Sequence, residues 1–227
     1  MALILSLDTS TTVCSVALAE NGQSVGKEIL YAEQSHSTHL TLLIEQVLSG
    51  VSKKMSDLDA VAVSEGPGSY TGLRIGVSTA KGLCYTLGIP LIAVSTLKAM
   101  ALSVSNEQNE PALFVPMIDA RRMEVYSATY NNQLELIDKV RPVILDGDSF
   151  KETLATHKVF FFGNGSDKFS DVINNGNAIF VKDVVPDAWA IGELANDMFS
   201  KEDFVDVAYF EPNYLKEYQA TKPKKLL

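Results

Sequence analysis

The strongest constraint on the fold is an order of predicted elements that occurs twice along the 227 residues. In each half, three strands are followed by a helix, a strand, a helix, a strand and a helix. The predicted strands lie at residues 2–8, 12–19, 24–32, 60–64, 91–95, 113–118, 123–130, 134–145, 158–162 and 178–181. The predicted helices lie after the cap residue Ser37, in the stretch ended by Gly88, and at 96–105, 148–156, 167–174 and 188–200. The halves share order but not sequence, so the repeat, at a period of about 110 residues, is topological.

This order is the layout of an α/β protein with two ribonuclease-H-like lobes, each a mixed sheet with flanking helices. The actin, hexokinase and Hsp70 ATPase superfamily has this arrangement. The most polar linker, SVSNEQNE at 103–110, predicts a boundary between lobes 1–103 and 104–227. The terminal segment is a candidate to pack back on the first lobe.

Composition restricts the function classes. Hydrophobic residues make up 46% of the chain and charged residues 21%, and the net charge is -9. Such an acidic chain gains nothing from counterion release, so tight direct binding of nucleic acid is disfavoured, with a short basic tail at 222–225 as the local exception. The amino-terminal apolar run meets Asp8 after a few residues, which predicts a strand in a cytoplasmic protein, not a signal peptide or membrane span. Cys14 and Cys84 are expected to be buried thiols.

The stretch Glu65–Lys81, EGPGSYTGLRIGVSTAK, runs from a glycine-rich loop into a helix. Gly72, Gly76 and Ala80 lie four residues apart, on one helix face that carries almost no side chain. Another backbone can come close there, either from the same lobe or from a helix of another subunit. A phosphate is less favoured, because the first lysine of the stretch is Lys81, far from the junction of loop and helix.

Two turns are candidates for vestigial phosphate contacts. LDTST places Asp8, Thr9, Ser10 and Thr11 at the tip of the first hairpin, where relatives in the ATPase superfamily contact metal and phosphate. The second candidate turn, which follows a strand of the second lobe, consists of Gly163, Asn164 and Gly165. In both cases the alternative is a tight turn that satisfies its own backbone groups.

No catalytic constellation is evident in the sequence. His36 and His39 could share one side of a helix, but the other histidine, His157, lies in the other half, so surface or capping roles are favoured and no metal site is expected. The chain has no G-x-S-x-G motif and no Walker loop with its lysine. Glu65, Asp119 and Asp187 are isolated carboxylates in the sequence, and the sequence places no partner for any of them.

EGPGSYTGLRIGVSTAKGL closely resembles the signature of the TsaB (YeaZ) family, and the likeness covers essentially the whole chain. LDTSTTVCSVAL is similar to the first hairpin of the family, VPMIDARRMEVYSATY to the opening of its second lobe, and PNYLKEY to its carboxyl-terminal PxYLR-type segment.

The resemblance implies a catalytically silent subunit that supports a TsaD-type protein, together with the ATPase TsaE. That assembly modifies adenosine 37 of tRNAs that read codons beginning with A. The resemblance also implies a homodimer, contact with tRNA only through the complex, and no tightly bound cofactor, with ATP or ADP bound only alongside partners. TsaD carries an HxxxH metal motif, whereas this chain reads HSTH followed by Leu40. The alternative function is an ATP-using enzyme or a peptidase acting on the TsaD partner.

Carried over by position, the segments that face a partner are 36–48 and 69–85. The residues expected there are His36, His39, Leu43, Gln46, Tyr70, Gly72, Arg74, Gly76, Val77, Ala80 and Tyr85.

Overall fold

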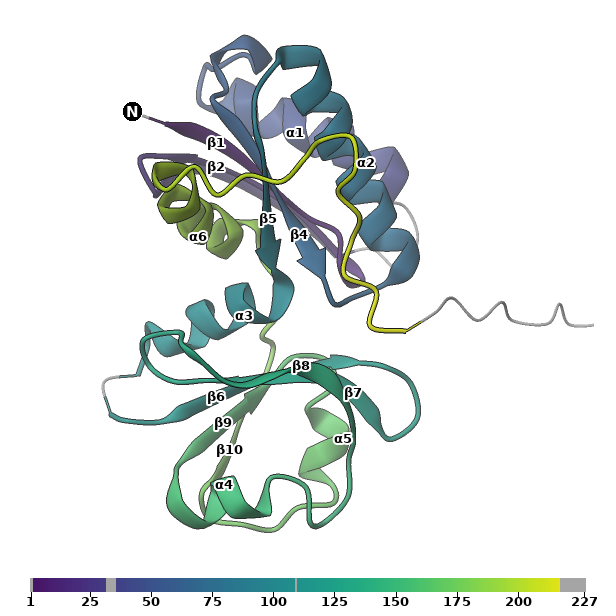
Figure 1. The fold of residues 1–227 in the computed structure, drawn as a ribbon, viewed down its shortest axis with the longest axis vertical. Coiled ribbons are helices and arrows are strands. Elements are labelled where there is room, and N and C mark those ends of the chain that lie inside the picture. The colour runs from purple at the N-terminus through teal and green to yellow at the C-terminus, as the bar shows by residue number, and fades with distance from the viewer. Residues whose placement is uncertain (1, 32–35, 109, 217–227) are drawn as a thin grey trace, which may run out of the picture.

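A computed structural model describes residues 2–31, 36–108 and 110–216 of the chain. Two five-stranded sheets form the centres of two lobes (Figure 1). The first sheet has the order β3-β2-β1-β4-β5, with β1 Leu3–Asp8, β2 Val13–Glu20, β3 Gln23–Tyr31, β4 Ala60–Gly66 and β5 Leu91–Ser95. Strand β1 pairs in parallel with β4 and antiparallel with β2. The predicted mixed sheet is therefore confirmed for this lobe.

The second sheet repeats this pattern in the order β10-β9-β6-β7-β8. Its strands are β6 Leu113–Asp119, β7 Glu124–Tyr130, β8 Leu136–Ile144, β9 Val159–Phe162 and β10 Ala178–Val181. Strand β6 pairs in parallel with β9 and antiparallel with β7, as β1 does with β4 and β2. The topological repeat predicted from the sequence is confirmed.

Helices cover the first sheet on both faces. Helices α1 (His36–Gly50) and α2 (Tyr70–Leu87) lie on one face, and α6 (Ala188–Ser200) lies on the other (Figure 1). Ser69 caps α2 by accepting the Gly72 amide, and Gly88 ends it at φ 67°. A short 3-10 helix, η1, spans Met55–Asp57. Helix α1 begins at His36, so Ser37 lies inside the helix and the predicted cap is wrong.

Helix α3 (Thr96–Ser105) lies between the two sheets and packs on β6. The second lobe is completed by the short helices α4 (Lys151–Thr156) and α5 (Asp167–Ser170), which are shorter than predicted. The core between this sheet and these helices contains interlocking rings, including Phe161, fully buried against Phe169 at a centroid distance of 5.0 Å.

The chain returns to the first lobe after β10. Helix α6 contacts β1, β2, β3, β4 and β5, although its sequence position follows the second sheet. Residues 201–216, which we call the strap, then run across the first lobe to the side of α2 (Figure 1). The division at residues 103 and 104 stays a prediction, and the contacts of α6 and the strap lie largely with the first sheet.

Candidate functional site

The turn that follows β1 is closed by the start of α2. The Thr9 hydroxyl donates to the Gly72 carbonyl at 2.7 Å, and the Ser69 amide donates to the Ser10 carbonyl at 2.6 Å. A Cβ atom at Gly72 would approach the Thr9 carbonyl oxygen more closely than the 3.0 Å that real Cβ atoms keep, and one at Gly76 would do the same to the Thr9 hydroxyl. The glycines therefore make room for Thr9 of the same lobe.

Asp8 lies beneath this turn and is fully buried. Its Oδ1 accepts hydrogen bonds from the Ser10 amide at 3.0 Å and from the Ser10 hydroxyl at 2.9 Å. Burial raises the pKa of the Asp8 carboxyl to about 6; the hydrogen bonds from Ser10 and the nearby Ser64 side chain oppose this shift, and the charge of Asp187 adds to it. Asp8 Oδ2 has no hydrogen-bond partner among the described residues, and the same holds for the buried hydroxyls of Ser6, Ser64 and Thr96.

The other predicted residues of the first turn serve local contacts. Thr11 accepts the Val13 amide through its hydroxyl at 3.3 Å. The Thr11 carbonyl lies 2.7 Å from His36 Nε2, which ties the start of α1 to the turn. The structure thus brings Asp8, Thr11 and His36 into one region, with their polar groups directed largely at neighbouring backbone.

The Gly163–Gly165 turn in the second lobe is shaped by packing. Gly163 has φ 94°, and a Cβ atom there would lie 2.5 Å from the Met117 carbonyl oxygen. The Asn164 side-chain oxygen accepts the Asp119 amide at 2.9 Å, and a Cβ atom at Gly165 would lie 2.7 Å from Val125. These contacts account for all three residues, and a nucleotide contact here stays a prediction.

The residues expected to face a partner divide into three groups by exposure. The buried group is Leu43, Gly72, Gly76, Val77 and Ala80. The half-buried group is His36, His39 and Tyr70. The exposed group is Gln46, Arg74 and Tyr85. Burial of the small-residue face favours the alternative in which its close neighbour belongs to the same lobe. For the exposed group, contact with a partner stays a prediction.

The sequence marks the terminal segment as a candidate to pack back on the first lobe, but it indicates none of the individual contacts of the strap. Lys81 Nζ donates to the carbonyls of Ala208 at 3.0 Å and Phe210 at 3.1 Å. The Tyr214 ring lies 4.6 Å from the Tyr70 ring, between centroids. The spacing of residues in the motif PNYLKEY does not indicate a contact with α2. Only the family resemblance marked this motif as one with a possible role.

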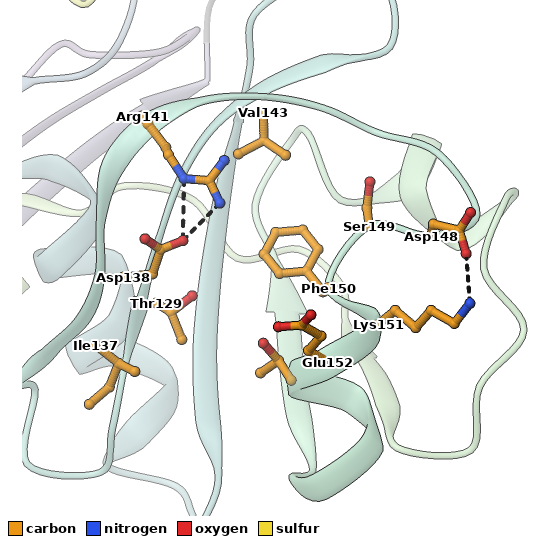
Figure 2. Close-up of a pocket in the computed structure, with 11 residues that line it drawn as sticks. Thr129, Ile137, Asp138, Arg141, Val143, Asp148, Ser149, Phe150, Lys151 and Glu152 are labelled. Carbon is orange, nitrogen blue, oxygen red and sulfur yellow. Dashed lines mark hydrogen bonds and ion pairs between the residues drawn. The ribbon is translucent and has the colours of Figure 1, made fainter.

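Two of the hollows on the surface of the described residues lie away from the predicted turns. A pocket of about 680 Å³ lies in the second lobe between β8 and α4 (Figure 2). Four of its charged side chains form two ion pairs, Arg141 with Asp138 at 2.8 Å and Lys151 with Asp148 at 3.1 Å. A second hollow, of about 570 Å³, lies between α2 and the strap and is lined by Lys81, Tyr85 and Asp206 among others.

Two further features are absent from residues 2–31, 36–108 and 110–216. No group of three or more histidine, cysteine, aspartate or glutamate residues in these ranges could hold a metal ion. No helix in the same ranges has the length and apolar character needed to cross a bilayer.

The chain has the two-lobed fold that is also seen in actin-type ATPases. An activator of 2-hydroxyisocaproyl-CoA dehydratase from Clostridium difficile, solved with bound ADPNP, superposes with a TM-score of 0.52 over 90% of this chain and 98% of that one. At 11% identity this likeness shows the fold alone.

Sequence comparison gives the family. The family described as "TsaD: tRNA N6-adenosine threonylcarbamoyltransferase" matches residues 30–224. TsaB from Escherichia coli, named as a tRNA threonylcarbamoyladenosine biosynthesis protein, is 30% identical over 226 residues, covering 96% of each chain. TsaB from Bacillus subtilis is 36% identical over 139 residues, 61% of this chain and 59% of that one. YeaZ from Pseudomonas aeruginosa superposes with a TM-score of 0.81 at 27% identity, over 95% of this chain and 100% of that chain. The chain belongs to the TsaB (YeaZ) family.

Proposed function

We propose that the chain is a non-catalytic subunit that binds and supports a TsaD-type protein, with a TsaE-type ATPase, in the cytoplasm. The assembly would carry out threonylcarbamoylation of adenosine 37 in tRNAs that read codons beginning with A. Membership of the TsaB family supports the process, because relatives in that family are named for it.

One observation supports the silent role more than any other. The first-hairpin turn, where ATPase relatives contact phosphate, uses its own hydroxyls inside the lobe: Thr9 donates to Gly72, and Ser10 donates to Asp8. The start of α2 covers the turn so closely that Gly72 admits no side chain. A phosphate placed there would have to displace α2. We therefore propose that the chain alone binds no nucleotide tightly and that ATP or ADP is bound only alongside its partners.

The outer face of α2 is the best candidate for the partner surface. Thr71, Arg74, Ser78, Gly82 and Tyr85 are exposed at helical spacing, on the side opposite Gly72 and Gly76. Tyr85 is 86% exposed, so its ring is accessible to a partner. Exposed aromatic and arginine side chains are the types that contribute most at interfaces. We assign this face to the TsaD-type protein, with a second copy of the chain as the competing occupant.

Reconstitution tests the proposal. The chain is mixed with TsaD-type and TsaE-type proteins, unmodified tRNA and a supply of threonylcarbamoyl-adenylate, and modified adenosine is counted. We expect modification to depend on the chain, and full-rate modification in its absence would contradict the proposed role.

A pair of variants tests the partner surface in the same mixture. Tyr85→Asp is expected to weaken association with the TsaD-type protein by about tenfold or more. Ile144→Asp is the matched control, because Ile144 is 73% exposed on β8 of the other lobe. Equal association of both variants would exclude the α2 face.

An ATP-using enzyme is the second candidate, and the free Oδ2 of buried Asp8 favours it. A carboxylate oxygen without a partner is a group that a bound cation would satisfy. Calorimetry of the isolated chain with ATP and magnesium separates the candidates, because micromolar binding with turnover would support the enzyme. The peptidase alternative stays a prediction from the family resemblance.

A further inference from the structure

We infer that the loop between β6 and β7, residues 120–123, binds phosphate groups of the tRNA backbone in the assembled complex. The inference rests on the proposed function, because that function supplies the RNA. It goes beyond it by giving this chain a direct contact with the substrate. The main observation behind it is a pair of adjacent arginines, Arg121 and Arg122, at the end of the hairpin.

Both arginines are held in an unfavourable backbone conformation. Arg121 has φ 71° and Arg122 has φ 52°, values that side chains other than glycine and asparagine rarely adopt. Hairpin connections usually place glycine, asparagine or aspartate at positions with φ above 0°. Two arginines at such positions lower the stability of the hairpin. A cost of this kind is expected where residues serve binding and not folding.

The loop is braced so that its guanidinium groups stay free. Lys168 Nζ donates to Asp119 Oδ1 at 2.5 Å and to the carbonyls of Arg122 at 2.8 Å and Glu124 at 2.6 Å. Asp119 Oδ1 also accepts the Arg121 amide at 2.9 Å. Lys168 and backbone donors thus hold the conformation of the loop, and among the described residues the two arginine side chains do not contribute to it.

The acidic groups near the loop are already paired with other cations. Asp119 pairs with Lys168, and Glu124 pairs with Lys216 of the strap. Arg121 and Arg122 are exposed and form no ion pair with any residue in the described ranges. The loop is therefore a local positive island on a chain whose net charge is -9.

The surroundings favour RNA over an acidic protein segment. Lys216 Nζ lies 5.9 Å from the centroid of the half-buried Tyr126 ring. Burial raises the pKa of Tyr126, and the charge of Arg121 opposes this rise by a smaller amount, so Arg121 acts on the same ring. Cations interleaved with an aromatic ring are typical of surfaces that bind nucleic acid. Guanidinium groups match phosphate oxygens in pairs, and their exposure suits a long backbone better than a small enclosed anion. A contact with two phosphates is compatible with the acidic charge of the whole chain, because the partners supply most of the affinity.

The test compares two double variants in the complete complex with TsaD-type and TsaE-type proteins. Arg121→Gln/Arg122→Gln removes the island, and Lys139→Gln/Arg141→Gln removes the same charge from exposed positions on β8. Fluorescence anisotropy gives the affinity for labelled, unmodified tRNA over a series of KCl concentrations. We expect the first variant to weaken binding about tenfold near physiological salt and to reduce the slope of log affinity against log salt by about 1 to 2. We expect the control to match the wild type.

A third variant separates binding from folding. Arg121→Asn/Arg122→Gly suits the observed φ angles, so it should raise or preserve Tm while losing the same tRNA affinity. Unchanged affinity and salt slope in both loop variants, with a wild-type complex that binds tRNA, would overturn the inference alone. Loss of association with the TsaD-type protein in the loop variants would assign the island to a protein partner and overturn the RNA contact. A wild-type chain that neither assembles nor supports modification would overturn the proposed function, and this inference with it.

Discussion

Replacing Gly72 by alanine tests the close contact between α2 and the turn that follows β1. The added methyl group would overlap the Thr9 carbonyl oxygen, which is backbone and cannot rotate away. The start of α2 or the turn must therefore shift. Such a shift would lengthen the hydrogen bond from the Thr9 hydroxyl to Gly72, 2.7 Å, and the bond from the Ser69 amide to Ser10, 2.6 Å.

The size of the effect follows from three contributions. Overpacking of a rigid site costs about 1 to 3 kcal/mol. Each of the two disturbed hydrogen bonds contributes about 1 kcal/mol to stability. Alanine is better than glycine inside a helix by about 1 kcal/mol, which offsets part of the loss. We expect Gly72→Ala to lower the free energy of unfolding by about 2 to 4 kcal/mol.

Gly82 provides a matched control on the same helix. A Cβ atom there meets nothing within 4 Å, so Gly82→Ala should gain the helix propensity, about 1 kcal/mol, without a clash. Urea titrations at 25 °C measure both variants, at a protein concentration where sedimentation shows a monomer. A Gly72→Ala variant as stable as the wild type would refute the close contact and reopen this turn to phosphate.

Three further changes probe other parts of the molecule. Phe161→Ala removes a fully buried ring that packs on Phe169 and should lower the free energy of unfolding by about 3 to 5 kcal/mol in urea; a loss below about 1 kcal/mol would contradict this packing. The folded-state pKa of Asp8, about 6, exceeds the ordinary value of 3.8, so the wild type loses stability as this carboxyl ionises. Asp8→Asn should therefore stabilise the chain increasingly as pH rises from about 4 to 7, reaching about 3 kcal/mol. A gain in stability that does not depend on pH would refute this reasoning. Tyr214→Ala should remove about 1 kcal/mol and speed hydrogen exchange in residues 211–216, since its ring lies 4.6 Å from Tyr70; unchanged exchange would show that the strap is held elsewhere.

Local signals in the sequence predicted most elements well. Strand β5 and helix α3 begin and end where their patterns indicated, and Asp187 caps α6 by accepting the Trp189 amide. These elements are bounded by caps and turns, whose chemistry is readable over a few residues. Helix α1 begins one residue before the predicted cap at Ser37, and the ring of its first residue, His36, contacts the Thr11 carbonyl 25 residues away. No local pattern reports such a contact.

Contacts between distant segments were harder to predict. Helix α6 is separated from β1 by the whole second lobe, yet its Gly192 packs against Ser6 and its Ala188 amide donates to Ser15 at 2.9 Å. An amphipathic pattern shows that a helix buries one face but not which sheet receives it. The positive φ angles of Arg121 and Arg122 could not be predicted from the sequence either, because arginine rarely adopts that conformation.

The two faces of α2 are linked by its glycines. Gly72 and Gly76 bring the helix so close to Thr9 that its inner face is fixed against the turn. The outer face of α2 contains Arg74 and Tyr85. Hydrogen bonds fix this helix at its start, through Ser69, and along its side, where Lys81 contacts the strap. A surface held in this way loses little conformational freedom when a partner binds, so more of the contact energy appears as affinity. The same small residues therefore close the turn after β1 and hold the outer face in place, on which the proposed partner contact depends.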